Sequence, residues 1–292
     1  MDAPLPTLEP RPAGAHKASG GRVRGGGGSE GMAGAPALAA RGALRAGAGL
    51  VVVAVPRAIV GITASFQAEA MVVPVPSERD GALDASSLPA IESLLARADA
   101  VVVGPGLSRA PGTGVLVRRL LAAPCALVLD ADGLHAVHGR LADLAARRAP
   151  TVLTPHEGEA AGLLGTVAAE VAASREDAAR RIAREARAVC VLKGPGTVVT
   201  DGERLRVNAT GGPVLATGGT GDVLAGVIGA FLAGLPGSGG DAFGAAVLAV
   251  YAHGRAADGR AARRGDRGTL ASEVADAIPA VLFDLHRPEP RR

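Results

Sequence analysis

The stretch that decides the fold is Ala216-Thr217-Gly218-Gly219-Thr220-Gly221-Asp222, which leads directly into Val223-Leu224-Ala225-Gly226-Val227. A glycine-rich turn that opens an apolar helix presents unpaired backbone N–H groups at the positive end of the helix dipole. Such a turn binds anions, phosphate above all, and its glycines admit the ligand where a Cβ would collide. Asp222 is then either a base beside the bound anion or a simple helix cap. The glycines favour the base, because a cap does not need them.

Outward from this turn, short apolar runs alternate with helical stretches along most of the chain. Leu50 to Val55 is rich in β-branched residues and ends at Pro56, which is typical of a strand buried on both faces. Further strands are predicted at 100–103, 126–129, 152–153 and 189–192, and helices at 34–46, 86–97, 113–122 and 175–187. Towards the C-terminus the pattern predicts a hairpin over 197–207, centred on Asp201-Gly202-Glu203, and helices at 222–233, 241–257 and 270–285. The alternation predicts an α/β fold with a central, mostly parallel sheet and helices on both faces.

The composition excludes several classes of protein. Apolar residues make up 48% of the 292 residues and charged residues 20%, which argues against a disordered chain. Aromatic residues are only 2%, and a binder of single-stranded nucleic acid needs rings for base stacking. The net charge of +3 is spread over interspersed acids and bases, so no nucleic-acid partner is expected. The two cysteines, Cys125 and Cys190, are too few for a disulfide framework or a zinc cluster.

The domain organisation is expected to be simple. We predict one domain over residues 16–286, between disordered segments at 1–15 and 287–292, with residues 1–31 as a loose N-terminal stretch. The beginning of the sequence lacks the basic and apolar regions of a secretory signal. The longest apolar candidate, Val223 to Leu235, is interrupted by glycines and falls short of the ~18–20 residues of a membrane span. A cytoplasmic protein without a membrane partner is therefore expected.

Four more turns follow predicted strands, and each has an ordinary structural interpretation beside a functional one. Gly104-Pro105-Gly106 is also a common sharp turn, the carboxylates of Asp130 and Asp132 could be caps, and His156 could be a cap or a core residue. Lys193-Gly194-Pro195-Gly196-Thr197 combines a cation with exposed backbone donors, which suits phosphate. Because ligands of open α/β sheets lie outside the carboxyl ends of the strands, we expect all these turns along one rim.

Better-known site motifs are absent from the sequence. There is no Walker loop, no dinucleotide-binding Gly-x-Gly-x-x-Gly with its distant acid, no Gly-x-Ser-x-Gly elbow and no His-Glu-x-x-His zinc pair. The residues by themselves therefore predict a nucleotide-dependent enzyme that acts on a hydroxyl-bearing substrate near Asp222.

The Gly-Gly-Thr-Gly-Asp turn resembles the anion hole of the ribokinase-like superfamily. With Thr154-Pro155-His156-Glu157-Gly158-Glu159, Lys193-Gly194-Pro195-Gly196-Thr197 and Asn208-Ala209-Thr210-Gly211, the chain resembles the stand-alone, ADP-dependent NAD(P)H-hydrate dehydratases of bacteria. The resemblance implies repair of the S-epimer of hydrated NADH and NADPH. The added hydroxyl is phosphorylated and phosphate is expelled, which gives NAD(P)H, AMP and phosphate.

The resemblance also implies a set of site residues. Four of them would contact the hydrated cofactor: Ala35, Gly106, His156 and Asp222. Six would hold the nucleotide: Lys193, Gly194, Pro195, Gly196, Thr197 and Gly221. Asp222, kept ionised by the helix dipole, would accept the hydroxyl proton. ADP is the expected co-substrate, with ATP as a possible donor, and Mg²⁺ would be held largely by phosphate oxygens, with no protein ligands assigned. A homo-oligomer, a tetramer, is expected.

Two departures from the family pattern keep rival hypotheses open. Arg24, Gly25 and Gly26 stand where branched apolar residues of a first strand are usual, which predicts a frayed or displaced strand at a sheet edge. Gly212 replaces a residue that is more often polar. The rivals are a ribokinase-like kinase acting on a vitamin-precursor alcohol, which would release a stable phosphate ester, and a non-catalytic nucleotide-binding module.

Overall fold

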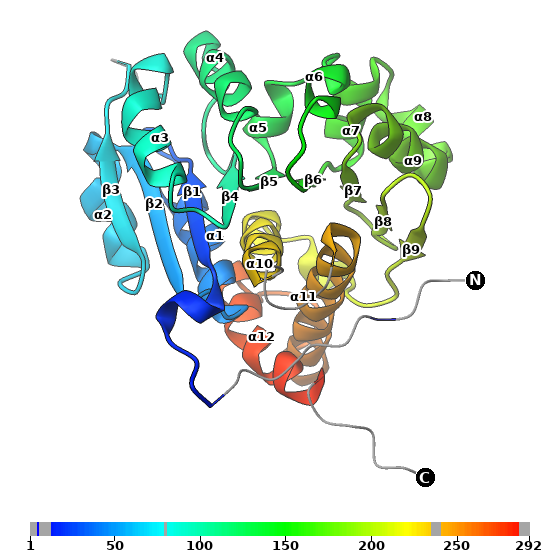
Figure 1. Ribbon diagram of the computed structural model, residues 1–292. Coiled ribbons are helices and arrows are strands. Elements are labelled where there is room, and N and C mark those ends of the chain that lie inside the picture. The colour runs from blue at the N-terminus through cyan, green and yellow to red at the C-terminus, as the bar shows by residue number, and fades with distance from the viewer. Residues whose placement is uncertain (1–4, 6–12, 79–80, 235–240, 286–292) are drawn as a thin grey trace.

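The computed structural model describes residues 5, 13–78, 81–234 and 241–285, and within them nine strands form one sheet (Figure 1). Its spatial order is β3-β2-β1-β4-β5-β6-β7-β8-β9. Neighbours from β3 to β7 are parallel, and β8 and β9 are added antiparallel at one edge. The strands are β1 Arg22–Gly26, β2 Leu50–Pro56, β3 Met71–Val75, β4 Ala100–Val103, β5 Ala126–Leu129, β6 Thr151–Leu153, β7 Val189–Leu192, β8 Val198–Thr200 and β9 Leu205–Val207.

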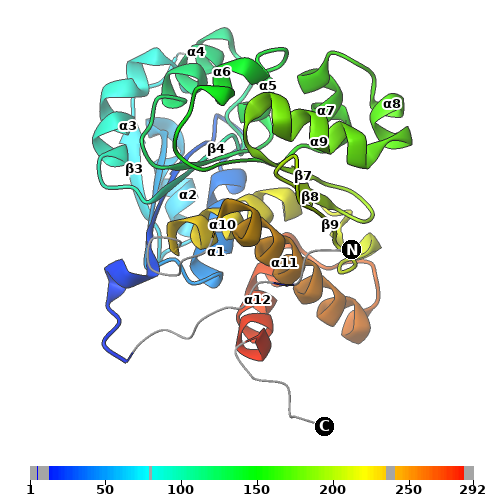
Figure 2. The ribbon, with the colours of Figure 1, turned by 45° about the vertical axis from the view of Figure 1, so that its right-hand side comes forward.

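Helices cover both faces of this sheet, as predicted (Figures 1 and 2). One face carries α1 (Gly34–Arg45), α10 (Thr220–Gly234), α11 (Ala242–Arg264) and α12 (Ala271–Leu285). The other is covered by α3 Leu88–Leu95, α4 Pro111–Leu120, α5 Asp132–His135, α6 Leu141–Ala145, α7 Glu157–Leu164, α8 Ala168–Ala173 and α9 Arg175–Ala186. Beside β3 lies α2 (Val60–Phe66), and short 3₁₀ turns occur at 17–20, 57–59, 85–87 and 213–215. The described residues contain no helix that is long and apolar enough to cross a membrane.

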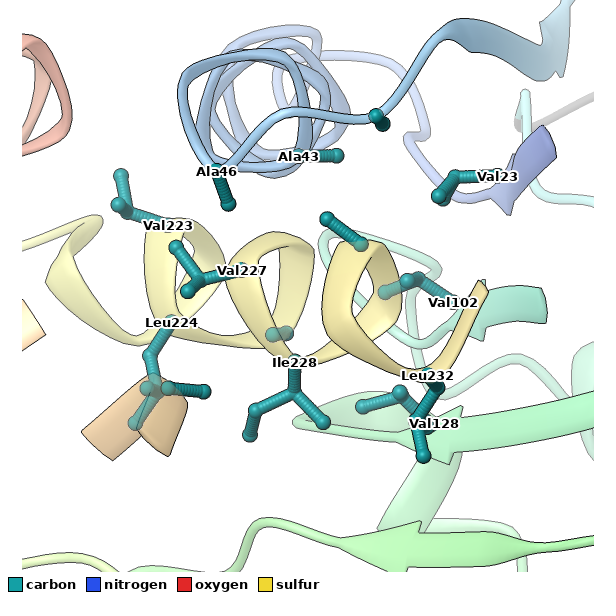
Figure 3. Packing of buried hydrophobic residues seen from close by; sticks show 14 of the residues in the cluster. Val23, Ala43, Ala46, Val102, Val128, Val223, Leu224, Val227, Ile228 and Leu232 are labelled. Carbon is teal, nitrogen blue, oxygen red and sulfur yellow. The ribbon is translucent and has the colours of Figure 1, made fainter. Parts of the chain in front are cut away.

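Small side chains let α10 lie directly against α1 and the sheet. Val227 of α10 points toward Ala43 of α1, and Leu232 points toward Val128 of β5 (Figure 3). A Cβ on Gly42 would lie 2.3 Å from the carbonyl oxygen of Val223, and one on Gly226 would lie 1.9 Å from that of Ala39. Contact of this kind is possible only for glycine, so the two backbones meet and the beginning of α10 is fixed at the rim of the sheet.

Most predicted elements occur within two residues of their expected ends, but one strand was not foreseen and another lies in a different place from the one expected. β3 was missed, and the stretch expected to be loose contains β1. The prediction of a frayed or displaced edge strand is wrong, because β1 lies inside the sheet, hydrogen-bonded in register to β2 on one side and β4 on the other. Arg24 is buried there, and its Nε donates a long hydrogen bond, 3.4 Å, to the carbonyl oxygen of Leu94. The expected disordered tail from residue 287 and most of the expected segment 1–15 lie outside the described residues.

The glycines of β1 leave a small void beneath α1. A cavity of about 20 Å³ is lined by Gly25 and Gly26 together with apolar residues of α1, β2 and β4. A Cβ on Gly25 would meet Val53 Cγ1 at 3.5 Å, an ordinary contact. A Cβ on Gly27 would lie 2.5 Å from the Pro105 carbonyl oxygen.

We therefore predict that Gly25→Ala stabilises the protein. It restricts the unfolded chain and fills part of the void, which is worth about 0.5–1 kcal/mol, or roughly 1–4 °C in Tm for a chain of this size. Thermal unfolding of both variants measures the effect, with Gly27→Ala as the matched control that should lower Tm. A Gly25→Ala variant no more stable than the parent would contradict the prediction.

Candidate active site

Side chains from three neighbouring strand ends meet around Lys193, which follows β7. Its Nζ donates a 2.7 Å hydrogen bond to Asp130 Oδ1, which follows β5, and lies 3.8 Å from Oε2 of Glu159 in α7. Asp130 is buried, and Thr154 Oγ1 donates to the same oxygen at 2.7 Å. Burial by itself would lower the pKa of Lys193, but the Asp130 and Glu159 carboxylates outweigh it and raise that pKa. Lys193 is therefore a firmly held cation.

The ammonium group of Lys193 lies at the beginning of α10. A Cβ on Gly221, the second residue of that helix, would be 3.5 Å from Nζ. The preceding turn depends on Gly219, whose φ is +91°, and Thr220 Oγ1 donates to the carbonyl oxygens of Leu215 and Thr217. A fixed positive charge is thus added to the positive end of the helix dipole, which is an arrangement suited to phosphate.

A cavity of 440 Å³ opens beside this point. Its lining includes all six residues that the sequence assigned to the nucleotide: Lys193, Gly194, Pro195, Gly196, Thr197 and Gly221. The lining also includes Leu215, Leu224 and Val250, so the cavity has both a cationic region and apolar walls. A cavity of this size and lining is typical of a small-molecule site.

Sequence reasoning missed one polar residue of this cavity, His253. Its side chain is buried, and Nε2 has no hydrogen-bond partner among the described residues. Burial lowers the pKa of His253 to about 4, so the ring is neutral at pH 7. No motif marks this histidine, which by sequence is one residue of the long helix α11.

Asp222 is the third residue of α10, and it does not cap the helix. No hydrogen bond to its carboxylate occurs within the described part of the chain. Burial raises its pKa to about 7, the nearby Asp130 and Asp132 add to this, and Lys193 only partly opposes them. The expectation of a fully ionised Asp222 is therefore wrong: burial and like charges outweigh the helix dipole. A carboxyl group with a pKa near 7 suits general-base chemistry at neutral pH.

The remaining substrate candidates form two separate groups. A Cβ on Gly106, whose φ is +67°, would lie 3.2 Å from the Cβ of Ala35, so these two are neighbours. His156 caps α7, as one of its two interpretations predicted: Nδ1 accepts from the N–H groups of Gly158 at 3.0 Å and Glu159 at 3.3 Å. Because Nδ1 accepts these hydrogen bonds, Nε2 is the ring nitrogen that carries a proton. No described contact joins Ala35 and Gly106 directly to His156 or Asp222.

Comparisons with known proteins show which family the chain is similar to. The family model described as NAD(P)H-hydrate dehydratase matches residues 27–280. The bifunctional NAD(P)H-hydrate repair enzyme of Moorella thermoacetica is 45% identical over 281 residues, 95% of this chain and 52% of that protein. The ADP-dependent (S)-NAD(P)H-hydrate dehydratase of Xanthomonas campestris is 38% identical over 246 residues, 83% of this chain and 81% of that protein.

A solved structure agrees with these relatives. That of the ADP/ATP-dependent NAD(P)H-hydrate dehydratase of Bacillus subtilis, co-crystallised with ATP and Mg²⁺, is 31% identical. It superposes with a TM-score of 0.81 and covers 96% of this chain and 95% of that chain. The fold is thus that of the ribokinase-like superfamily, to which solved neighbours of this structure belong. Within that class, the chain belongs to the NAD(P)H-hydrate dehydratase family. It spans about half the length of the bifunctional relative.

The charges around Asp222 predict a specific pH dependence. A general base must lose its proton, so kcat/KM rises with pH and levels off above the pKa of Asp222 in the free enzyme, with a midpoint near pH 7. Asp130→Asn removes a neighbouring negative charge that raises this pKa, so the midpoint moves to lower pH.

The measurement is kcat/KM across pH 5–9 for the parent, the Asp130→Asn variant and an Asp143→Asn variant, with the substrates of the function proposed below. Asp143→Asn is the matched control, because Asp143 is an exposed carboxylate whose ion pair is with Arg140. The same midpoint for the Asp130→Asn variant and the parent would contradict the assignment.

Proposed function

We propose that this chain catalyses the ADP-dependent dehydration of the S-epimer of hydrated NADH and NADPH. The observation that carries the proposal is a carboxyl group of pKa near 7 in the first turn of a helix whose N-terminus also contains Gly221, beside the ammonium group of Lys193. Both of these residues line the cavity together with the other nucleotide candidates. The names of the relatives from X. campestris and B. subtilis support the same reaction.

The reaction has two bond changes at the added hydroxyl. Its oxygen attacks the terminal phosphorus of ADP, the bond to the leaving AMP oxygen breaks, and the hydroxyl proton passes to Asp222. The carbon–oxygen bond of the phosphate ester then breaks, phosphate leaves with the electron pair, and loss of a ring proton restores the double bond. The products are NAD(P)H, AMP and phosphate.

Each part of the site has a role in this scheme. Asp222 accepts the hydroxyl proton, and its position in the first turn of α10 brings it close to the N–H groups that stabilise charge on the transferring phosphoryl group. Lys193 adds a positive charge at the same place. The turn from Gly194 to Thr197 offers backbone donors to the nucleotide, and Ala35, Gly106 and His156 would contact the hydrated cofactor.

The proposal includes an Mg²⁺ ion that binds together with the nucleotide. The described residues contain no cluster of three or more histidine, cysteine or acidic side chains able to hold a metal ion. Mg²⁺ commonly takes its ligands from substrate phosphates, waters and one or two carboxylates. Here the nucleotide phosphates would supply most of the ligands of Mg²⁺. Glu159, whose carboxylate lies near Lys193, is a candidate for a carboxylate ligand. When bound, the ion neutralises phosphate charge.

The remaining expectations complete the proposal. We include a single catalytic domain over residues 16–286, a cytoplasmic location and a homotetramer, which light scattering of the purified protein would test. The non-catalytic rival drew its support from a degraded first strand, and β1 is fully paired in the sheet.

The decisive experiment mixes hydrated NADH with ADP or ATP and Mg²⁺ and follows the absorbance of regenerated NADH. We expect NADH to form, with a higher kcat/KM for ADP than for ATP. Accumulation of a stable phosphate ester without NADH would instead favour the kinase rival, and comparable or higher kcat/KM with ATP would contradict the donor preference.

Asp222→Asn is the control for chemistry in this assay. Loss of a general base costs ~10²–10⁴-fold in rate, so turnover should fall by that factor while nucleotide binding persists. Folding disfavours ionisation of this buried carboxyl group, so the parent loses stability as the pH rises from the range in which an ordinary carboxyl group ionises to about 7. The variant should therefore match the parent in stability only at acid pH and be more stable at pH 7 and above. Turnover that stays near normal in the folded variant would show that Asp222 is not the base.

A further inference from the structure

A second cavity, which is polar, is lined in part by Asp132 at the beginning of α5. It has a volume of 310 Å³, and its lining includes Ser108, Arg109, Thr113, Arg118, Asp132 and His135. The negative charge of Asp132 contributes to the raised pKa of Asp222, so the cavity and the candidate base are electrostatic neighbours. None of its lining residues is assigned a role in the reaction proposed above.

The cavity carries more positive than negative charge. Arg109 Nε lies 3.2 Å from Asp132 Oδ1, and Arg118 Nη1 donates a long bond, 3.4 Å, to the carbonyl oxygen of Ala136. The other guanidinium N–H groups of both arginines make no hydrogen bond within the described residues. The lining therefore holds two guanidinium groups against one carboxylate, that of Asp132, and both groups retain donors in the fork geometry that matches phosphate oxygens.

The loop that holds Arg109 has strained backbone and is hydrogen-bonded to the segment after β5, whereas Arg118 lies on α4. Among the described non-glycine residues, Ser108, Ala131 and Arg187 have positive φ, at 73°, 47° and 49°. Ser108 and Ala131 flank this cavity, and Ser108 N–H donates to Asp132 Oδ2 at 2.9 Å. A backbone held in such conformations is typical of functional sites, where the surrounding structure fixes it. This hydrogen bond joins the loop after β4 to the segment after β5.

We propose that this cavity, the Arg109–Arg118 cavity, binds a phosphate group of the hydrated dinucleotide. The inference rests on the proposed function, which brings the hydroxyl of that substrate to Asp222. A nicotinamide dinucleotide has a pyrophosphate, and the NADPH form has an additional 2′-phosphate. Either group is an anion that can reach beyond the reacting ring and bind two guanidinium groups.

Arg118→Gln tests this subsite, with Arg119→Gln as the matched control. Both arginines are exposed on α4, but Arg119 does not line the cavity, so the pair separates a local contact from a general loss of positive charge. Steady-state kinetics with hydrated NADH and with hydrated NADPH give KM and kcat for each variant. Calorimetry with NAD⁺ and NADP⁺ gives Kd values that do not depend on turnover.

We expect Arg118→Gln to raise KM about tenfold or more, the effect of a lost charge-assisted hydrogen bond, with kcat and the KM for ADP unchanged. A rise for hydrated NADPH alone identifies the 2′-phosphate, and an equal rise for both substrates identifies the pyrophosphate. Kd for NADP⁺, or for both dinucleotides, should rise in parallel.

The inference is overturned if Arg118→Gln and Arg119→Gln give the same KM and Kd values, or if only the KM for ADP changes. Failure of the proposed function has a different signature, since the parent itself would then regenerate no NADH. In that event the calorimetric comparison still decides whether the Arg109–Arg118 cavity binds dinucleotide phosphate.

Discussion

The backbone contact between α1 and α10 is the constraint on which the site depends. Gly42 and Gly226 remove the side chains that would keep the two helices apart, so α10 lies against α1 on one side and the sheet on the other. A core with so few aromatic rings is built by close approach of small residues rather than by large ones. Because α10 cannot slide without collision, its first turn stays where the strand ends meet.

The ion pair between Lys193 and Asp130 has a different purpose from stabilising the fold. Burying two charges costs free energy that their attraction only partly returns, so such a pair is weak evidence for stability. Its effect here is positional: Asp130 and Thr154 fix the ammonium group beside Gly221. The same carboxylate raises the pKa of Asp222. Asp130 thus fixes the position of the Lys193 ammonium group and also helps to raise the pKa of Asp222.

The sequence predicted an element correctly wherever the pattern that indicates it lies within the element itself. β4, β5 and β7 have the predicted bounds because strands buried on both faces are continuous apolar runs. The place of β1 was predicted wrongly because Arg24 and Gly25 disfavour a strand by propensity, and pairing from both β2 and β4 overrides that preference. β3 contains Pro74 and exposes Met71, so its pattern is weak. The prediction of an ionised Asp222 failed for a similar reason: its raised pKa comes first from burial and then from Asp130, and only the fold produces both.

The two cavities take their residues from different strand ends of the sheet, and one of them is lined by Gly221, the residue before Asp222. The nucleotide candidates come from the turn after β7 and the beginning of α10, whereas the two arginines come from the β4 side of the sheet. Phosphoryl transfer requires the attacking and leaving oxygens to lie roughly in line through phosphorus, so donor and acceptor need separate binding regions with the base between them. A parallel sheet supplies such regions at its rim, because neighbouring strand ends carry different loops toward one helix N-terminus. In the proposed reaction, a phosphoryl group would be transferred beside Lys193 to a dinucleotide that carries phosphates of its own. Cations on both sides would then offset the repulsion between those phosphates and the nucleotide.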